Sequence, residues 1–340
     1  MNSSSQVCSR TVLSRTFSMA VAFALLVSVL TVNMASAQSS SDGQDLKSGE
    51  SEWCGTQILY DLKYGSKREG QLCPPEGPCD DPVTRDGWIP DSLTPITYVN
   101  VFFHVFRNDD GTNPAASTQD VADAVDDLNA QYLPWRIQFE YDMQFVNSTA
   151  FRNLTSNGEF DAMKNAYAVR PDSQCNIYVA SVNVNGSVFS FGTFPWDPDA
   201  LNATGGIVLN RTQFPPFSHT VMSHEMGHNL GLWHTHHGVS EVGSCGACYE
   251  SPGSGNGDVA GDFCSDTPPT PTNFNCGGPG GSDGCTGAAW GSTDFRNIMG
   301  YGPSACVDHF TSQQGGRINC WTDDMLSSWL NNVRIQADTV

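Results

Sequence analysis

An eleven-residue segment, HEMGHNLGLWH at positions 224–234, constrains this chain more than any other feature. The residues around its first half predict a helix, on which His224 and His228 are four positions apart and lie on one face. Gly231 can then turn the chain and bring His234 to the same point from outside the helix. Three converging imidazole nitrogens are typical of a Zn²⁺ site that keeps its fourth position open.

Glu225 directly follows the first of these histidines and gives the predicted site a chemical use. Zinc lowers the pKa of a bound water to about 7, and an adjacent carboxylate can take the proton and pass it to a leaving group. The pattern therefore predicts hydrolysis with Glu225 as general base. An inactive, metal-stabilised extracellular binding or matrix protein is the second hypothesis, although such a protein has no need of this carboxylate. A hydrolase acting on a non-peptide bond is the third.

The remaining histidines that the sequence singles out have no such spacing. His236 and His237 follow the motif closely, but no spacing relates them to a ligand set, so we expect them at the surface. His104 and His219 receive no role from the sequence.

The first 37 residues have the pattern of a secretory signal peptide. Arg10 and Arg15 precede an apolar run at 17–32, and small residues at 35–37 predict cleavage after position 37. An uncleaved membrane anchor is the alternative, because the apolar run is nearly long enough to span a bilayer. The cleavage pattern favours secretion to the extracellular space, without a stable membrane anchor once the segment is removed.

Charge and glycosylation patterns agree with an extracellular setting. The 340 residues carry 16 Lys and Arg against 36 Asp and Glu, a formal charge of −20. Nucleic acids and anionic membranes are not expected partners, because binding to them depends on clustered basic residues. Five Asn-x-Ser/Thr patterns, typical of glycosylated loops, begin at Asn147, Asn153, Asn185, Asn202 and Asn210.

The rest of the chain divides into three regions that differ in composition and in hydrophobic periodicity. Residues 38–93 are rich in Ser, Gly, Pro and Asp with little periodicity, which is typical of a prosegment or linker. The next region predicts strands at 96–106, 135–145, 175–182 and 205–210, and helices at 117–133, 160–169 and 218–230. This alternation predicts an α/β layer around a mostly parallel sheet. Residues 238–296, with five cysteines, predict a long irregular loop held by disulfides or ions.

The histidine motif resembles the signature of the metzincin metallopeptidases, and NIMGY at 297–301 is similar to their Met-turn. GDFCSDTPPT at 261–270 and HFTSQQGGRI at 309–318 resemble two further stretches of the pappalysin family. This resemblance covers about residues 96–318. It implies a metzincin-type catalytic domain at 94–340, with a twisted, mostly parallel sheet, an active-site helix and an irregular, disulfide-rich C-terminal subdomain. It also implies a zinc endopeptidase that acts on protein or peptide substrates and is made as a latent precursor.

The same resemblance assigns roles to individual residues. It makes His224, His228 and His234 the zinc ligands, Glu225 the general base, and Met299 a residue that underlies the metal. Tyr301 is placed near the metal or the reaction's oxyanion, with a packed tyrosine as the alternative.

Asp262, Asp266 and Thr267 lie in the loop that corresponds to calcium-binding structure in pappalysins. Their oxygen atoms are the hard ligands that Ca²⁺ prefers. A loop with few buried apolar side chains needs a bound ion of this kind to stabilise it. The alternative is that this Asp-rich stretch is only a turn.

The sequence departs from the family pattern at four positions. Cys264 replaces an apolar residue, and Gly300 replaces a common Asp. Gly315 and Gly316 are expected to weaken the following helix by roughly 1 kcal/mol each relative to Ala.

WCGT at 53–56 resembles a Cys-Gly-Thr stretch near the start of pappalysin precursors. A thiolate binds zinc at about 2.3 Å, so Cys54 can occupy the fourth position and exclude water until the prosegment is cut, after Arg68 or after Arg85. We therefore consider Cys54 a candidate cysteine switch.

The number of cysteines is compatible with this switch and with an alternative. Eleven of the 12 cysteines follow the predicted signal peptide, so one thiol is left over. If Cys54 is that thiol, the other ten can form five disulfides. Otherwise Cys54 pairs with Cys73 or Cys79 and another cysteine is free.

Overall fold

The computed structural model describes residues 53–64, 73 and 75–331. Its helices are α1 (Thr56–Tyr64), α2 (Pro82–Gly87), α3 (Thr118–Tyr132), α4 (Thr149–Arg152), α5 (Asn157–Tyr167), α6 (Val221–Asn229), α7 (His237–Ser240) and α8 (Ser312–Asp324). Its strands are β1 (Thr97–Arg107), β2 (Ile137–Asn147), β3 (Asn153–Leu154), β4 (Cys175–Val182) and β5 (Ile207–Asn210). The predicted signal peptide and Arg68 lie outside the described residues. Among the helices that are described, none is long and apolar enough to cross a membrane.

The predicted α/β layer is confirmed as a five-stranded sheet, ordered β2-β1-β4-β3 with β5 also paired to β4. The strand pairs are parallel, and β1 and β2 remain in register from Thr97↔Ile137 to Arg107↔Asn147. Each strand and helix expected from periodicity forms, with ends that differ by no more than three residues. The predicted capping box of α3 is also present, because Ser117 and Asp120 bond each other's backbone N–H groups at 3.1 and 2.7 Å.

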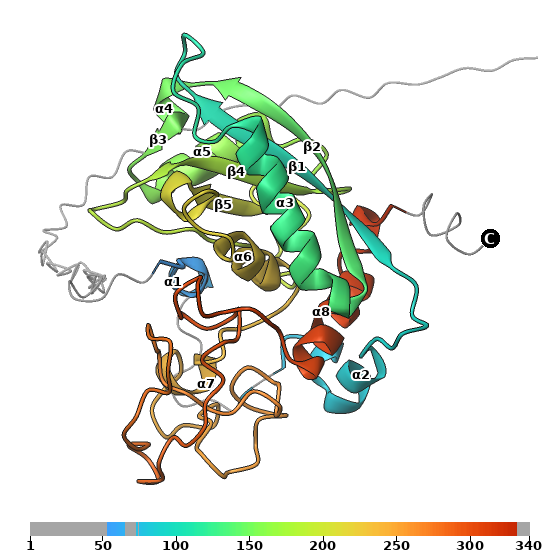
Figure 1. Cartoon of the computed structure of the whole chain (residues 1–340), viewed down its shortest axis with the longest axis vertical. Coiled ribbons are helices and arrows are strands. Elements are labelled where there is room, and N and C mark those ends of the chain that lie inside the picture. The colour runs from blue at the N-terminus through green and yellow to red at the C-terminus, as the bar shows by residue number, and fades with distance from the viewer. Residues whose placement is uncertain (1–52, 65–72, 74, 332–340) are drawn as a thin grey trace, which may run out of the picture. The chain divides into compact units, whose positions relative to one another are not determined.

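Both faces of the sheet are covered, as expected for parallel strands. Successive side chains of a strand point to opposite faces, so Ile177 of β4 enters one cluster with α3 and α6, whereas Tyr178 enters another with α5. Figure 1 shows α3 and α6 lying on the same side of the sheet. This packing against both the sheet and α3 fixes α6, which carries the histidine motif.

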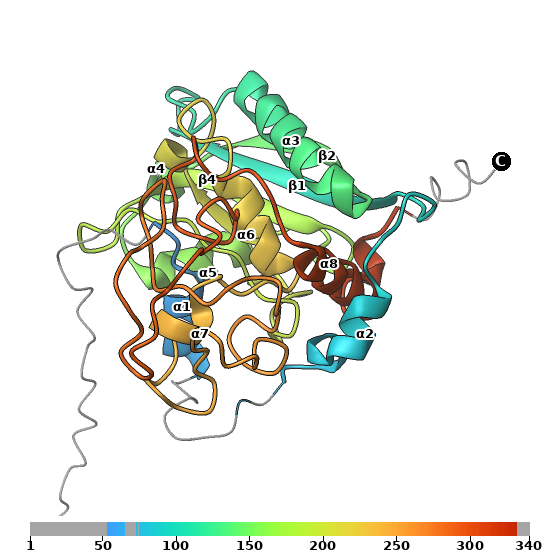
Figure 2. The same cartoon turned by 60° about the horizontal axis from the view of Figure 1, so that its bottom comes forward.

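The Gly315-Gly316 pair has a packing role in α8 that offsets its low helix propensity. A Cβ on Gly315 would lie 2.1 Å from the Trp135 ring, and one on Gly316 would lie 2.5 Å from the main-chain oxygen of Arg85. Only glycine allows such close approach. Figures 1 and 2 both show α2, which contains Arg85, beside α8.

The described C-terminal part of the segment expected to be a linker is packed rather than extended. Cys79 forms a disulfide with Cys320 of α8, and the Arg85 side chain is fully buried. The guanidinium of Arg85 donates to the main-chain oxygen of Phe263 at 2.6 Å. Cleavage after Arg85 is therefore a wrong prediction, because a protease cannot reach this side chain. Disulfides and ion pairs hold this segment, and such contacts leave no periodic pattern in the sequence.

Residues 238–296 form the predicted irregular segment around α7 (Figure 2). The disulfides in the described residues are Cys73–Cys248, Cys79–Cys320, Cys245–Cys285 and Cys276–Cys306, while Cys54, Cys175 and Cys264 are free. Cys54 therefore pairs with neither Cys73 nor Cys79. The expected fifth disulfide is also absent from these residues, since Cys175 is buried in β4 with its Sγ 3.4 Å from Asn229.

Candidate metal centre and active site

The three predicted zinc ligands meet at one point. His224 and His228 lie one turn apart on α6, and all residues of this helix are buried. The helix ends at Asn229, and Gly231, with φ of 95°, turns the chain so that His234 approaches from outside. The three Nε2 atoms lie 3.1 to 3.2 Å from one another.

The opposite ring nitrogens fix the tautomers of these histidines. The Nδ1 atoms lie at hydrogen-bond distance from oxygens: His224 from Ile298 O at 2.7 Å, His228 from Leu232 O at 2.8 Å, and His234 from Glu241 Oε1 at 2.6 Å. These oxygens only accept, so each Nδ1 carries the proton and each Nε2 keeps its lone pair. Burial lowers the pKa of all three imidazoles, which keeps them neutral.

Three facing lone pairs repel one another unless a cation lies between them. Nitrogens bound tetrahedrally to Zn²⁺ at about 2.0–2.1 Å lie about 3.3 Å apart, close to the spacing seen here. The donor set therefore fits a zinc ion.

Glu225 is fully buried beside this cluster. Its Oε2 accepts a hydrogen bond from the Thr56 hydroxyl at 3.0 Å, whereas its Oε1 has no hydrogen-bond partner among the described residues. Burial raises the pKa of the Glu225 carboxyl to about 8, against the opposite effect of hydrogen bonds from Thr56 and Cys54. One oxygen of this carboxyl is thus available to exchange a proton.

The Met299 segment packs directly against α6. A Cβ on Gly227 would lie 2.5 Å from the Met299 sulfur, so the motif needs glycine at this position. The neighbouring Ile298 carbonyl orients His224, and the Met299 carbonyl accepts from the Thr235 N–H at 3.2 Å. Met299 therefore packs against α6, the helix that carries His224 and His228.

Tyr301 is 4% exposed, and its ring centroid lies 4.8 Å from that of His234. Its hydroxyl donates to the main-chain oxygen of Cys54 at 3.4 Å. The phenol thus reaches the ligand cluster and contacts the N-terminal segment that covers it.

Residues 53–56 cover the histidine cluster. The Cys54 sulfur lies 3.4 Å from His228 Nε2, and with the three Nε2 atoms it forms a group in which no two ligand atoms are more than 4.8 Å apart. The main chain on both sides of Cys54 pairs with Ser190, through Gly55 N to Ser190 O at 2.7 Å and Ser190 N to Trp53 O at 3.0 Å. The cysteine is therefore held at the position of a fourth ligand.

Comparisons with known proteins agree with this geometry. No protein-family model matches the chain. Pappalysin-1 of Homo sapiens is 37% identical over 175 residues, which are 50% of this chain and 10% of that protein. An extracellular metalloprotease of Colletotrichum graminicola is 30% identical over 244 residues, which are 68% of this chain and 78% of that protein. The chain belongs to the pappalysin family of metzincin metalloproteases. It spans about a tenth of the length of pappalysin-1.

Solved structures show the same fold for this metalloprotease. Promirolysin of Tannerella forsythia aligns with a TM-score of 0.58 at 17% identity, over 84% of this chain and 98% of that chain. Mature mirolysin in complex with a cleaved peptide aligns with a TM-score of 0.52 at 18% identity, over 70% and 98%. The expected metzincin-type α/β fold is confirmed.

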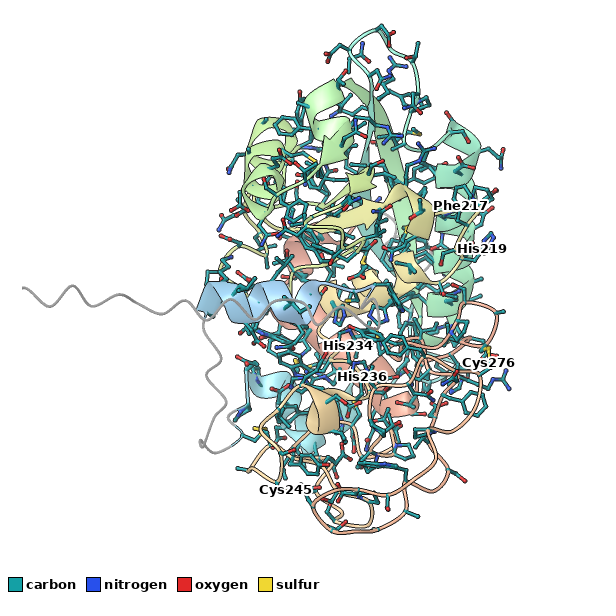
Figure 3. All side chains as sticks on the ribbon, turned by 90° about the vertical axis from the view of Figure 1, so that its left-hand side faces the viewer. Phe217, His219, His234, His236, Cys245 and Cys276 are labelled. Atoms are coloured by element: carbon teal, nitrogen blue, oxygen red, sulfur yellow. A yellow bond between two sulfur atoms is a disulfide. The ribbon has the colours of Figure 1, made fainter. Side chains whose placement is uncertain are left out.

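The expectation that His236 and His237 lie at the surface is wrong. They are 2% and 3% exposed, and both face the carboxylate of Glu241. His237 Nδ1 lies 2.9 Å from Glu241 Oε2, and the His237 ring stacks on Trp233. Figure 3 shows His234 and His236 close together beside α7. The i, i+4 spacing of His237 and Glu241 was the available sequence signal for this contact.

The three candidate calcium residues do not all face one another. Asp262 Oδ2 accepts from the Thr267 hydroxyl at 2.7 Å, but Asp266 accepts from the Gln313 N–H at 2.9 Å, at the start of α8. The sequence missed Glu250, which lies beside Asp262. Burial raises the pKa of both carboxyls, and the charge of Asp262 raises that of Glu250 further.

One of the five glycosylation patterns is excluded by the fold. Asn210 is 2% exposed, and its amide donates to the Val182 carbonyl at 2.6 Å. The other four asparagines are exposed, as an acceptor must be: Asn147, Asn153, Asn185 and Asn202.

Proposed function

We propose that this metalloprotease is a secreted zinc endopeptidase, synthesised as a latent precursor, that hydrolyses protein or peptide substrates. The observation that carries the proposal is the convergence of three unprotonated Nε2 atoms beside a buried carboxyl with one unpaired oxygen. Two of the comparisons support it, since the fungal relative is named an extracellular metalloprotease and mirolysin was solved with a cleaved peptide.

His224, His228 and His234 would hold the zinc ion, which supplies a Lewis acid for the peptide carbonyl and for water. Glu225 takes a proton on Oε1 from the water that attacks the peptide carbonyl and transfers it to the leaving amine. The burial of Glu225, with its Oε1 unpaired among the described residues, suits this carboxyl to hold a proton between the two transfers. The Tyr301 hydroxyl, once released from the Cys54 carbonyl, donates to the developing oxyanion.

Latency follows from the position of residues 53–64. The Cys54 sulfur lies at the fourth ligand position, where its thiolate would bind zinc, and the Thr56 hydroxyl engages the Oε2 atom of Glu225. Cys73 is tied to Cys248, so a cut between Tyr64 and Cys73, such as after Arg68, frees the covering segment while later residues stay attached. We therefore place the end of the removable prosegment before Cys73 rather than at residue 93.

Digestion of a proteome-derived peptide library by the cleaved protein tests this proposal. We expect cleavage that stops when a chelator removes the metal and returns when zinc is added. A folded, zinc-loaded protein that is freed of the covering segment and still cleaves no peptide would favour the inactive binding protein. Turnover of esters or amides outside peptides, without peptide cleavage, would favour a hydrolase of another bond.

We also propose a calcium ion in the 261–270 loop, held by Asp262 and Thr267 together with Glu250. The support is the buried pair of acidic side chains, because a divalent cation relieves their repulsion. Adding Ca²⁺ to dialysed protein is expected to raise the Tm by mass action in the wild type but not in Glu250→Gln. An unchanged Tm in the wild type would leave this loop as a simple turn.

A further inference from the structure

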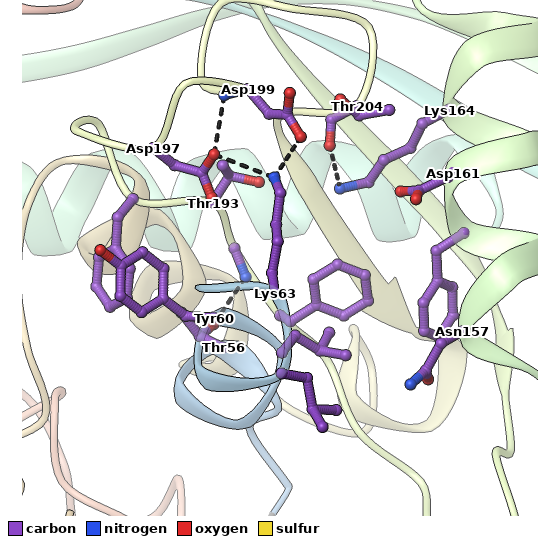
Figure 4. Close-up of a pocket in the computed structure, with 16 residues that line it drawn as sticks. Thr56, Tyr60, Lys63, Asn157, Asp161, Lys164, Thr193, Asp197, Asp199 and Thr204 are labelled. Carbon is purple, nitrogen blue, oxygen red and sulfur yellow. Dashed lines mark hydrogen bonds and ion pairs between the residues drawn. The ribbon is translucent and has the colours of Figure 1, made fainter. Parts of the chain in front are cut away.

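A cavity of about 290 Å³ lies between α1, α5 and residues 191–204, outside the metal cluster. Its walls combine apolar side chains, among them Leu59, Phe160 and Phe191, with two carboxylates, Asp197 and Asp199. Figure 4 shows both carboxylates turned toward the side chain of Lys63, which enters from α1. One wall of the cavity thus belongs to the segment that covers the active site.

The Lys63 ammonium is bound by two acidic side chains at the edge of this cavity. Its Nζ lies 3.2 Å from Asp197 Oδ1 and also pairs with Asp199 Oδ2. The Tyr64 hydroxyl donates to the same Asp197 oxygen at 2.6 Å. Asp197 is 7% exposed, so its charge is largely withdrawn from water and depends on these partners.

The other cation at this cavity, Lys164, forms no ion pair with either carboxylate among the described residues and acts on them only through its nearby charge. Lys164 donates to the Thr204 carbonyl at 3.0 Å and lies over the Phe191 ring. Within the described part of the chain, Lys63 is the cation that pairs with Asp197 or Asp199. Removal of α1 would therefore leave two neighbouring carboxylates without an ion-pair partner, with Lys164 as the nearby charge.

The site would keep its shape after α1 leaves. The Asp199 N–H donates to Asp197 Oδ1 at 2.8 Å, and this bond involves no prosegment atom. The segment that leads into α1 pairs with the main chain at Ser190, an edge that an extended peptide can use once it is free. A substrate on that edge can therefore reach the carboxylates that Lys63 vacates.

We propose that Asp197 and Asp199 form a substrate subsite for a Lys or Arg side chain, and that Lys63 fills this subsite in the latent precursor. The inference rests on the proposed peptidase function. Lys63 is nine residues beyond Cys54: two extended steps of about 3.3 Å each lead to Thr56, and the seven steps within α1 rise about 10 Å at about 1.5 Å per residue. An extended peptide covers the helical part alone in about three residues and the whole path in about five, at about 3.3 Å each. The basic side chain thus lies about four residues from the scissile bond.

The test compares peptides that differ by one side chain. Two series carry either Lys or the uncharged norleucine at each position from two to six residues from the scissile bond, on either side. Protein cleaved between Tyr64 and Cys73, and freed of the released segment, is measured as wild type, Asp197→Asn/Asp199→Asn and Asp142→Asn. Asp142 is an exposed carboxylate of β2, and its variant controls for loss of charge.

In the wild type and in Asp142→Asn we expect kcat/KM to be about tenfold higher with Lys at one position about four residues from the cut. The double variant should lose this preference, so that its kcat/KM values for the Lys and norleucine peptides become equal at every position. An equal rate for Lys and norleucine in the wild type, or an unchanged preference in the double variant, would show that the carboxylates only anchor the prosegment. If the double variant fails to fold, Asp199→Asn alone carries the same comparison.

Binding separates failure of the subsite from failure of the peptidase function. Fluorescence anisotropy of labelled peptides on cleaved Glu225→Ala protein needs no turnover. Tighter binding of the Lys peptide, lost when Asp197 and Asp199 are also replaced, supports the subsite even if no peptide is cleaved. Equal affinities for Lys and norleucine peptides would overturn it even if cleavage is efficient.

Discussion

The Nδ1 atom of His234 lies 2.6 Å from the Oε1 atom of Glu241. His224 and His228 donate instead to main-chain carbonyls, so His234 is the candidate ligand with an ionic partner. A carboxylate in this position fixes the tautomer and the ring orientation and makes the metal-binding nitrogen more basic. Glu241 is thus a positioning residue for the metal site, and it also holds His237.

Glu241→Ala is expected to weaken zinc binding by about 10–100-fold, the usual effect of losing such a partner. Glu241→Gln keeps an acceptor for His234 Nδ1 but removes the charge, so it should lose less zinc affinity than Glu241→Ala. Chelator competition measures the zinc affinity directly. Equal affinities in the wild type and Glu241→Ala would show that His234 is oriented by packing alone.

Replacement of Glu225 by Ala should leave zinc in place and reduce peptide hydrolysis by about 10²–10⁴-fold. Metal ligation and proton transfer belong to different side chains, since the three Nε2 atoms converge without help from Glu225. Metal content by mass spectrometry, measured beside turnover of the cleaved protein, checks both parts. A zinc-loaded variant with full activity would remove Glu225 from the mechanism.

The sequence predicted the metal site well because its geometry is local. Two helical residues one turn apart and a glycine turn determine the convergence of His224, His228 and His234. Other contacts depend on how distant segments dock. Thr56 bonds Glu225 although the two residues are 169 positions apart in the sequence, and Lys63 bonds Asp197 at a separation of 134. No regular spacing in the sequence predicts either contact. No pattern in one segment reveals which distant partner it meets.

The same limit explains the expectations that were wrong. Arg85 is buried through contacts with residues far along the chain, among them the Phe263 carbonyl and the Asp258 carboxylate, which no local pattern predicts. For Gly315 the sequence shows the low helix propensity but not the approach of Trp135, which requires glycine at this position.

Tyr301→Phe should lower kcat of the cleaved enzyme more than it raises KM. The hydroxyl now bonded to the Cys54 carbonyl becomes free to stabilise the oxyanion, an interaction made in the transition state. Steady-state kinetics on one peptide separates the two parameters. Equal kinetics for both proteins would mean that Tyr301 serves packing against His234 and His236.

Cys54→Ala should make the uncleaved precursor active, because the sulfur that lies 3.4 Å from His228 Nε2 is removed. Thr56→Val is the matched control, since it removes the hydrogen bond to Glu225 and leaves the thiol. Thiol labelling should find Cys54 of the unfolded wild-type precursor unpaired. A silent Cys54→Ala precursor whose cleaved form works would leave steric blockage by α1 as the cause of latency.

His104 should make the fold sensitive to acid independently of the metal. It is buried in β1, with Nε2 2.8 Å from Asn176 Oδ1 and Nδ1 2.9 Å from Gln144 Nε2, so the neutral ring donates to one partner and accepts from the other. Protonation of Nδ1 would leave its N–H facing the amide N–H of Gln144, so that two donors would face each other without an acceptor. Burial, opposed by the Asn176 hydrogen bond, lowers the pKa of His104 from 6.5 to about 4.

The folded-state pKa of His104 lies below the unfolded value, so its contribution is fully present above about pH 6.5 and is lost as the pH falls toward 4. At about 1.4 kcal/mol per pH unit, the free energy of unfolding should fall by about 2–3 kcal/mol over that window. A glutamine at position 104 cannot titrate, so the free energy of unfolding of His104→Gln should fall less over the same window. Urea denaturation of both proteins at pH 7 and pH 4.5 measures how far the free energy of unfolding falls in each. Other titrating groups are common to both proteins, so their contributions cancel in the comparison. Parallel losses in the two proteins would show that His104 is not the acid-sensitive group.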